Sequence, residues 1–264
     1  MLTEHELTSG MKVLEARPEG RARRPGVVLL HERYGIDQHT KDLGEKLAAD
    51  GFVALLPDMF HRFDGDREAL RRGDERADMA DDEALADLDE AVAFLRGLPY
   101  TTDEIGIIGV CQSGRQPLLF AAHRHDVASV VVLYGGVGDR DWEPDERRPS
   151  SVGDFIKALD CPVLGLFGEE DHVVSLENVR RFRDELERAN KSYRMRIYRG
   201  APHGWLNDTM PGRYRREAAE AAWSELTSFL RGTFAGEWDP GHVVWEFASD
   251  VSPGYDFSKN VRLA

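Results

Sequence analysis

A cysteine flanked by small residues is the feature of this sequence that most directly indicates chemistry. Cys111 lies in the segment Gly109-Val110-Cys111-Gln112-Ser113-Gly114, after an apolar run typical of a buried strand and before a segment typical of a helix. This is the pattern of a nucleophile elbow, where small neighbours let strand and helix approach closely. The helix N-terminus would stabilise a thiolate or an oxyanion there. The alternative is an inert cysteine buried beside a glycine-rich turn.

Two further residues stand where the partners of such a nucleophile belong. Asp171 follows the apolar run 162–167, and His203 follows a predicted strand that ends near Tyr198. A loop aspartate or a loop histidine alone is usually a surface residue. In α/β-hydrolases, however, the nucleophile, the acid and the histidine appear in this order, each on a loop after a strand. The three positions together predict a triad in which His203 is the base and Asp171 orients it.

The elements that must position these residues alternate regularly along the chain. Apolar runs predict strands, and segments with apolar residues three and four apart predict helices. The predicted strands are 11–16, 26–31, 52–56, 105–108, 127–134, 162–167 and 193–198, and the helices 40–50, 83–98, 117–123, 175–189 and 215–230. This alternation predicts an α/β fold with a mostly parallel central sheet and helices on both faces. The polar segment 58–82 is expected to be irregular.

The composition argues against several classes of partner. The chain has 264 residues, 41% of them hydrophobic, and a formal net charge of −14. An acidic chain repels phosphate backbones and anionic membrane surfaces, so nucleic acid and membrane partners are not expected. No apolar run approaches the ~20 residues of a membrane span, and the N-terminus lacks the apolar region of a signal peptide. We therefore expect a cytoplasmic protein.

The C-terminal residues break the alternation. We predict one hydrolase domain over residues 1–231 and an extension over residues 232–264. The extension is rich in large apolar side chains, namely Trp238, Val243, Val244, Trp245, Phe247, Tyr255 and Phe257. Exposing so many together would leave an adhesive patch. We expect the extension to pack as an extended or irregular arm, either on its own domain or on a second subunit in a homodimer.

Three stretches give the chain a specific resemblance. They are His31-Glu32-Arg33-Tyr34-Gly35 after the first buried strand, the Cys111 elbow, and Asp171 together with the segment 203–208. In these stretches the chain resembles the dienelactone hydrolase family of α/β-hydrolases, over residues of about 11 to 231. The resemblance implies the α/β-hydrolase fold and the cleavage of a small-molecule ester or lactone through a thioester on Cys111.

The resemblance also implies roles for residues around the triad. Glu32 would lie against the thiol and take its proton when substrate binds, because an ordinary thiol with a pKa of about 8.5 is mostly protonated at neutral pH. The backbone N–H groups of Arg33 and Gln112 would form the oxyanion hole. Residues expected to contact the substrate are Tyr34, Arg62, Arg115 and Trp205.

The chain departs from the family at two places. The family holds the substrate carboxylate with arginines, one of them four residues after the catalytic histidine, and this chain has Asn207 there. Arg62, Arg71 and Arg72 in the polar segment are candidates to replace it, or they are solvated surface residues. Arg115 stands where the family usually has a small or apolar residue, and it either faces the pocket or pairs with an acid. The identity of the substrate therefore stays open.

Other classes of chemistry lack their motifs. The histidines show no HExxH or CxxC context, so no metal site is expected. The chain has neither a GxGxxG motif nor a P-loop, so no cofactor is expected. Two alternatives to ester or lactone hydrolysis remain. The same site can cleave another acyl bond (thioester, amide or carbon–carbon), or the fold can be a catalytically silent relative that binds a ligand.

Overall fold

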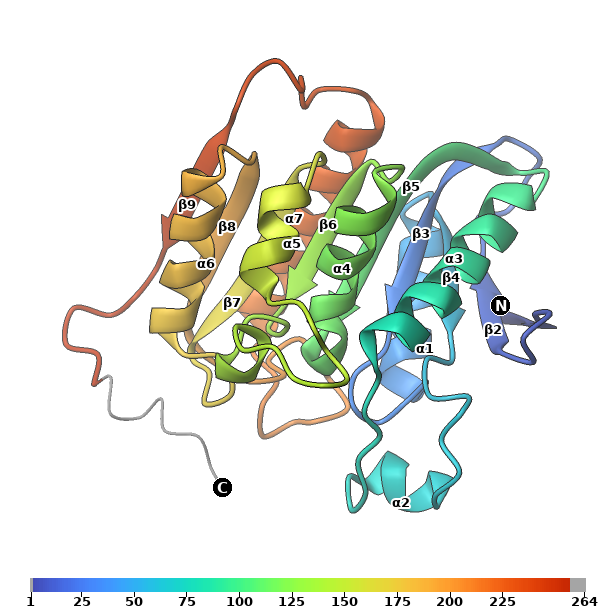
Figure 1. The fold of residues 1–264 in the computed structure, drawn as a ribbon, viewed down its shortest axis with the longest axis horizontal. Coiled ribbons are helices and arrows are strands. Elements are labelled where there is room, and N and C mark those ends of the chain that lie inside the picture. The colour runs from blue at the N-terminus through green and yellow to red at the C-terminus, as the bar shows by residue number, and fades with distance from the viewer. Residues whose placement is uncertain (1, 257–264) are drawn as a thin grey trace.

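Runs of apolar residues form the central strands of a twisted sheet (Figure 1). The computed structural model describes residues 2–256, and within them the strands form one nine-stranded sheet in the order β1-β2-β4-β3-β5-β6-β7-β8-β9. The strands are β1 (Leu2–Glu6), β2 (Lys12–Ala16), β3 (Arg24–Leu30), β4 (Val53–Pro57), β5 (Thr101–Val110), β6 (Ser129–Leu133), β7 (Val163–Glu170), β8 (Tyr193–Pro202) and β9 (Trp245–Ser249). Strands β1 and β2 are antiparallel to their neighbours, and the pairs from β4 to β9 are parallel.

Helices cover both faces of this sheet. They are α1 (Gln38–Ala49), α2 (Arg67–Arg72), α3 (Asp81–Gly97), α4 (Arg115–Arg124), α5 (Val152–Ala158), α6 (Leu176–Arg188) and α7 (Arg216–Phe234), with short 3-10 turns at Cys111–Gly114 and Asp139–Asp141. Helices α1 and α7 pack on one face, and α3, α4, α5 and α6 pack on the other. The predicted α/β-hydrolase architecture, with a mostly parallel sheet between two helical layers, is confirmed.

The central strands are buried on both faces, as expected for parallel strands between helical layers. In β6, Val130 and Val132 belong to the core under α3 to α6, whereas Val131 and Leu133 belong to the core under α1 and α7. Successive side chains of a strand point to opposite faces. A continuous apolar run is therefore what two helical layers require.

Within residues 2–231, one strand and two α-helices lie where the sequence predicted none. Strand β1 is polar except for Leu2 at its start, so no alternation of apolar and polar residues marks it as a strand. Helix α2 interrupts the polar segment 58–82 for six residues, with the Asp66 side chain capping its N-terminus. Helix α5 begins after Ser151, whose hydroxyl accepts a hydrogen bond from the backbone N–H of Asp154. Helices this short give too little periodicity to be recognised.

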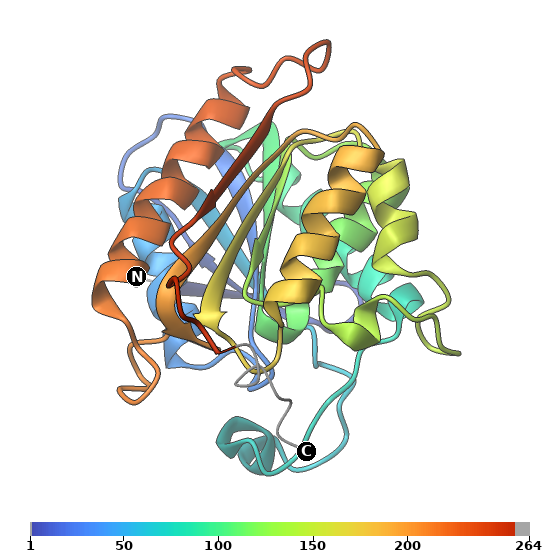
Figure 2. The same cartoon turned by 90° about the vertical axis from the view of Figure 1, so that its left-hand side faces the viewer.

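The C-terminal extension packs along the edge of its own sheet. Strand β9 pairs in parallel with β8, and Figure 2 shows it running along the outer edge of that strand. Upstream of β9, the Trp238 ring lies 5.2 Å from the Phe229 ring of α7. Downstream, the backbone N–H of Ser252 donates to the Glu169 carboxylate. Phe257, which the sequence groups with these residues, lies outside the described part. Whether the extension also contacts a second subunit stays a prediction.

Removing residues 237–264 should lower the thermal unfolding midpoint. The deletion uncovers the edge of β8 and the Phe229 ring, and loss of one buried apolar side chain alone costs about 2 kcal/mol. In a domain of this size that loss lowers the midpoint by about 4–8 °C. Calorimetry on the deletion and on the control Phe247→Thr, which changes an exposed side chain of β9, measures it. An unchanged midpoint in the deletion would show that the extension adds no stability.

Candidate active site

The predicted site residues gather at one edge of the sheet. Glu32 follows β3, Cys111 follows β5, Asp171 follows β7 and His203 follows β8. Parallel strands bring their carboxyl ends to the same edge, where α/β folds bind their ligands. Three of these residues, Glu32, Cys111 and His203, line one pocket of about 380 Å³.

The turn at Cys111 is sharp and left-handed. Cys111 has a φ of +55°, a conformation that residues with a side chain rarely adopt. The turn also brings backbone segments together. A Cβ atom at Gly109 would overlap with the carbonyl oxygen of Ser113, and one at Gly135 would overlap with the carbonyl oxygen of Cys111. Glycine is therefore required on both sides of the turn, in β5 and after β6. This is the geometry of a nucleophile elbow.

A chain of hydrogen bonds runs from the thiol to a buried carboxylate. The Sγ atom of Cys111 lies 3.1 Å from Nε2 of His203, and Nδ1 of His203 lies 2.9 Å from Oδ2 of Asp171. The Asp171 carboxylate also accepts hydrogen bonds from the backbone N–H groups of Val173 and Val174. Both His203 and Asp171 are buried, whereas Cys111 is partly exposed to the pocket. The structure thus brings together the three residues that the sequence predicts as a triad.

The electrostatics favour a charged imidazole. Burial of His203 opposes protonation, but the carboxylate of Asp171 and the neighbouring Cys111 outweigh it, so the pKa of His203 lies well above its ordinary value of 6.5. A histidine that holds a proton next to a sulfur atom stabilises a thiolate, and later gives a leaving group its proton.

Glu32 is held by two neutral donors. Its Oε1 accepts a hydrogen bond of 3.1 Å from the Tyr134 hydroxyl, and its Oε2 accepts one of 2.8 Å from the Asn207 side-chain amide. Burial first, and then the charges of Glu32 and Cys111, raise the pKa of Tyr134 well above 10, so its hydroxyl stays a donor. Asn207, at the position where the resemblance leads one to expect an arginine, holds Glu32.

Three further residues that the sequence predicts for the site lie in the pocket wall. Arg33, Tyr34 and Gln112 all line the pocket. The Arg33 guanidinium donates to the carbonyl of Gly73, and the Gln112 amide donates to the carbonyl of Ala77. The side chains of both predicted oxyanion-hole residues are thus occupied elsewhere, and only their main chain is left for the role predicted for them.

The sequence of this chain matches the model of a known protein family. The model of the dienelactone hydrolase family matches residues 11–234. The chain belongs to the dienelactone hydrolase family. It is therefore a hydrolase, and the extension after residue 234 lies outside the part that the family shares.

Individual relatives agree with this assignment. A protein of Methylorubrum extorquens named "Putative carboxymethylenebutenolidase" is 32% identical over 78% of this chain and 72% of its own. A Bradyrhizobium protein named "Probable 2-oxo-3-(5-oxofuran-2-ylidene)propanoate lactonase" is 30% identical over 84% of this chain and 89% of its own. The crystal structure of a "Putative Dienelactone Hydrolase" from Klebsiella pneumoniae has a TM-score of 0.78 at 26% identity, covering 88% of this chain and 98% of that chain.

Two of the residues expected to contact the substrate lie elsewhere in this dienelactone hydrolase family member. Arg62 is outside the Cys111 pocket and pairs with Asp87 of α3 at 2.5 Å. Trp205 is fully buried, with its ring 5.7 Å from that of Tyr134 and 5.0 Å from that of Tyr198. The structure does not bring these two side chains to the pocket wall, because the polar loop arginine pairs with a nearer carboxylate and the large apolar ring packs in the core. Tyr34 and Arg115 do line the pocket.

Sequence reasoning missed several residues of the site. Tyr134 and the glycines after it follow β6 just as Cys111 follows β5, so their place after a strand was an available signal. Arg76 and Arg213 line the pocket from loops that no local pattern distinguishes. Among residues 2–256, neither of these two side chains forms an ion pair with a carboxylate.

Other site types are limited in the part of the chain that the structure describes. Residues 2–256 contain no group of three or more histidine, cysteine, aspartate or glutamate side chains able to hold a metal ion. Over the same residues, none of the helices combines the length and apolarity that a bilayer crossing demands.

Asp171→Asn should destabilise the protein most at low pH. A raised pKa of His203 means that the stabilisation from its pair with Asp171 is complete below the unfolded pKa of about 6.5 and is lost as pH rises through the folded pKa. Breaking a buried pair costs about 3–5 kcal/mol. Urea unfolding at pH 6 and pH 10 should give a larger loss at pH 6.

The control for this variant is Asp160→Asn. Asp160 forms a half-exposed pair with His125 at 3.2 Å, and exposed pairs contribute only about 0–1 kcal/mol. Equal losses for Asp171→Asn at both pH values would contradict the raised pKa of His203.

Proposed function

We propose that this hydrolase cleaves an ester or lactone through a thioester acyl-enzyme on Cys111, with His203 and Asp171 completing the triad. The observation that carries the proposal is the continuous chain from Sγ of Cys111 through His203 to Asp171, with distances of 3.1 and 2.9 Å. A nucleophile within hydrogen-bond reach of a base that a third group orients is the arrangement that covalent catalysis needs.

In the acylation step, the thiolate of Cys111 attacks the carbonyl carbon and forms a tetrahedral intermediate. The backbone N–H groups of Gln112 and Arg33 receive its oxyanion, a stabilisation worth several kcal/mol in related sites. The intermediate collapses to a thioester when the carbon–oxygen bond breaks, and His203 gives its proton to the leaving oxygen. In a lactone the leaving oxygen stays attached to the acyl chain.

In the deacylation step, His203 accepts a proton from a water molecule as the water attacks the thioester. The second tetrahedral intermediate expels the Cys111 thiolate and releases a carboxylic acid. The thiolate then takes back the proton that Glu32 holds, which restores the starting state. Asp171 holds the imidazole with Nδ1 protonated and Nε2 toward the thiol, which both steps require. Its own carboxylate is fixed by the backbone N–H groups of Val173 and Val174.

Glu32 would generate the thiolate by accepting the thiol proton when substrate binds. Its carboxylate lines the same pocket as Cys111. Tyr134, whose hydroxyl donates to Glu32, also lies edge-on to the His203 ring with 5.5 Å between the ring centres, so Glu32 and the triad share a neighbour. Tyr134 and Asn207 keep the carboxylate in place without neutralising it.

The substrate class follows from the pocket and the relatives together. A cavity of about 380 Å³ suits a small molecule. The names of the relatives refer to lactones, and we extend that class to this chain. Arg76 and Arg213 are placed to meet an anionic group on such a substrate.

Cys111→Ala should remove turnover without unfolding the protein. Loss of a covalent nucleophile typically costs about 10³-fold or more in kcat/KM, whereas the partly exposed thiol adds little to packing. Hydrolysis of p-nitrophenyl acetate and of simple lactones, with the thermal midpoint, measures both. Cys161→Ala is the matched control, because Cys161 is the other free thiol and is buried away from the pocket.

Cys111→Ser refines this test. A hydroxyl is far less acidic than a thiol, so Glu32 should activate it poorly and turnover should stay well below wild type. Wild-type rates in Cys111→Ser would overturn the thiolate step, and wild-type rates in Cys111→Ala would overturn the nucleophile. A wild-type protein that turns over none of the esters and lactones would favour a silent ligand-binding relative.

Glu32→Gln should slow acylation by about 10²-fold, the lower end for a lost general base. The substitution keeps the shape of the side chain and removes its basicity. Stopped-flow measurement of the p-nitrophenol burst gives the acylation rate directly. Tyr134→Phe serves as the comparison, since it removes one hydrogen bond to Glu32 and keeps the carboxylate. Acylation at the wild-type rate in Glu32→Gln would refute the role of Glu32.

A further inference from the structure

The residue at the start of the helix after the elbow is a buried arginine. Arg115 is the first residue of α4, is 2% exposed, and lines the Cys111 pocket. Its guanidinium forms a two-pronged ion pair with Asp81, with Nε to Oδ1 at 3.1 Å and Nη2 to Oδ2 at 2.8 Å. A buried guanidinium without such partners would be strongly destabilising, so this side chain is fixed by the groups around it.

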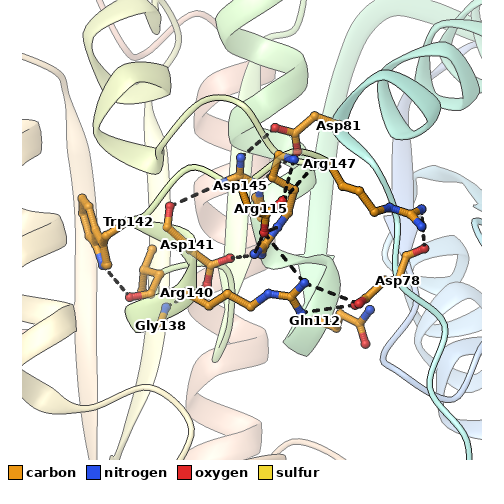
Figure 3. A network of polar contacts seen from close by, with 12 residues as sticks. Asp78, Asp81, Gln112, Arg115, Gly138, Arg140, Asp141, Trp142, Asp145 and Arg147 are labelled. Atoms are coloured by element: carbon orange, nitrogen blue, oxygen red, sulfur yellow. Dashed lines mark hydrogen bonds and ion pairs between the residues drawn. The ribbon is translucent and has the colours of Figure 1, made fainter.

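The same guanidinium bonds to a second segment. It donates to the carbonyl oxygens of Asp141 and Ser150, at 3.2 and 2.5 Å, and lies 4.6 Å above the ring of Phe155 in α5. Figure 3 shows Arg115 between Asp81 on one side and Asp141 on the other. One side chain on the nucleophile's helix thus joins the start of α3 to the loop between β6 and α5.

Both of these segments contribute to the wall of the pocket. Arg76, Asp78 and Met79 line it just before α3, whereas Gly138, Arg140 and Asp141 line it from the loop after β6. Nearer the surface the walls also meet directly, because Arg140 bonds to the Asp78 carboxylate at 3.3 Å. That pair is half exposed and therefore weak. The two walls are also joined where the backbone N–H of Asp81 donates to the carbonyl of Arg147 at 2.9 Å. Arg115 adds the buried, charged contacts between them.

The loop wall is partly buried and carries charged groups where Arg115 holds it. The Asp141 side chain accepts from the backbone N–H of Gly138 at 2.9 Å and lies 3.7 Å from Arg148. Burial raises the pKa of Asp141, and the nearby guanidinium groups of Arg115 and Arg148 oppose that rise. Displacing Arg115 would therefore disturb the charge balance of this wall as well as its position.

We propose that Arg115 is a positioning residue that fixes both pocket walls relative to Cys111 and so determines the size of the acyl group that fits. The substrate part of this proposal rests on the proposed acyl transfer at Cys111. Arg115 acts through Asp81 and the loop carbonyls, and its guanidinium is occupied by them. It therefore sets the shape of the pocket and supplies no group to the reaction.

The chain offers a matched control on the same two helices. At the far end of α4, Arg124 forms a two-pronged ion pair with Asp89 of α3 through Nε and Nη2. That pair is exposed, at 38% and 40%, and its residues are outside the pocket. Arg124→Met thus removes an Arg–Asp link between α4 and α3 without touching a pocket wall.

The first readout is selectivity among p-nitrophenyl esters of increasing acyl size, from acetate to benzoate. Arg115→Met should change the ratio of kcat/KM for benzoate over acetate by about tenfold, because small displacements around a reacting group cost large factors in rate. The change should appear mainly in KM for the larger ester. Arg115→Lys should restore part of the wild-type ratio. Arg124→Met should leave the ratio unchanged.

The second readout needs no catalysis. Alkylation of Cys111 by iodoacetamide and by the bulkier N-phenylmaleimide, located by mass spectrometry, reports the space around the thiol. Arg115→Met should change the ratio of the two rates, and Arg124→Met should not. If no ester is turned over while the alkylation ratio still changes, the proposed function fails and the role of Arg115 stands.

A double variant separates shape from stability. Arg115→Met leaves Asp81 buried without its partner, so that variant is expected to unfold more easily. Adding Asp81→Asn removes the stranded charge and should restore much of the thermal midpoint, yet both ratios should stay altered. Wild-type ratios in the folded double variant, or equal changes in Arg115→Met and Arg124→Met, would overturn the proposal while ester turnover stays intact.

Discussion

The left-handed turn at Cys111 is the constraint on which the rest of the site depends. A cysteine at a φ of +55° is held in a conformation that costs of order 1–3 kcal/mol. The surrounding structure imposes it through close backbone contacts at Gly109 and Gly135. The hydroxyl of Ser113 adds a tie by donating to the carbonyl of His31, at the end of β3. The turn that carries the nucleophile is therefore joined by one hydrogen bond to the residue before Glu32, which follows the neighbouring strand.

The parallel sheet brings the residues of the candidate site to one edge. Four strand ends supply Glu32, Cys111, Asp171 and His203, and residues far apart in the chain meet because parallel neighbours end at one edge. The loops that follow the strands supply the other side chains of the site. The loop after β6 supplies a pocket wall, and the loop after β8 supplies Asn207, which reaches Glu32 across 175 residues of sequence. The strand order that defines the fold therefore also decides which residues meet in the site.

The sequence could predict those parts of the structure that local rules decide. Ser175 caps α6 as a serine before an amphipathic segment should, and the continuous apolar runs became the buried parallel strands. The approach of Cys111, Asp171 and His203 follows from their places after strands. The contacts of Arg62 and Trp205 do not, because they depend on which carboxylate or which core cavity lies nearest after folding. The pairing of Arg115 with Asp81 is of the same kind, since the two residues lie 34 positions apart on different helices.

Asn207 stands where the resemblance leads one to expect an arginine, and this difference changes which residues hold Glu32 and which can meet an anionic substrate. An arginine at this place could hold a substrate carboxylate or neutralise Glu32, because a guanidinium is always charged. The shorter amide of Asn207 ends on Glu32 Oε2, and the Tyr134 hydroxyl takes Oε1. Two neutral donors therefore orient the carboxylate in the pocket that holds Cys111. Any anionic group of the substrate must then be met by cations from other elements, and Arg76 and Arg213 stand in the pocket wall without a carboxylate of their own in residues 2–256. The carboxylate and the two guanidinium groups come from three different loops, after β3, before α3 and after β8, so the pocket can present both kinds of group to a ligand.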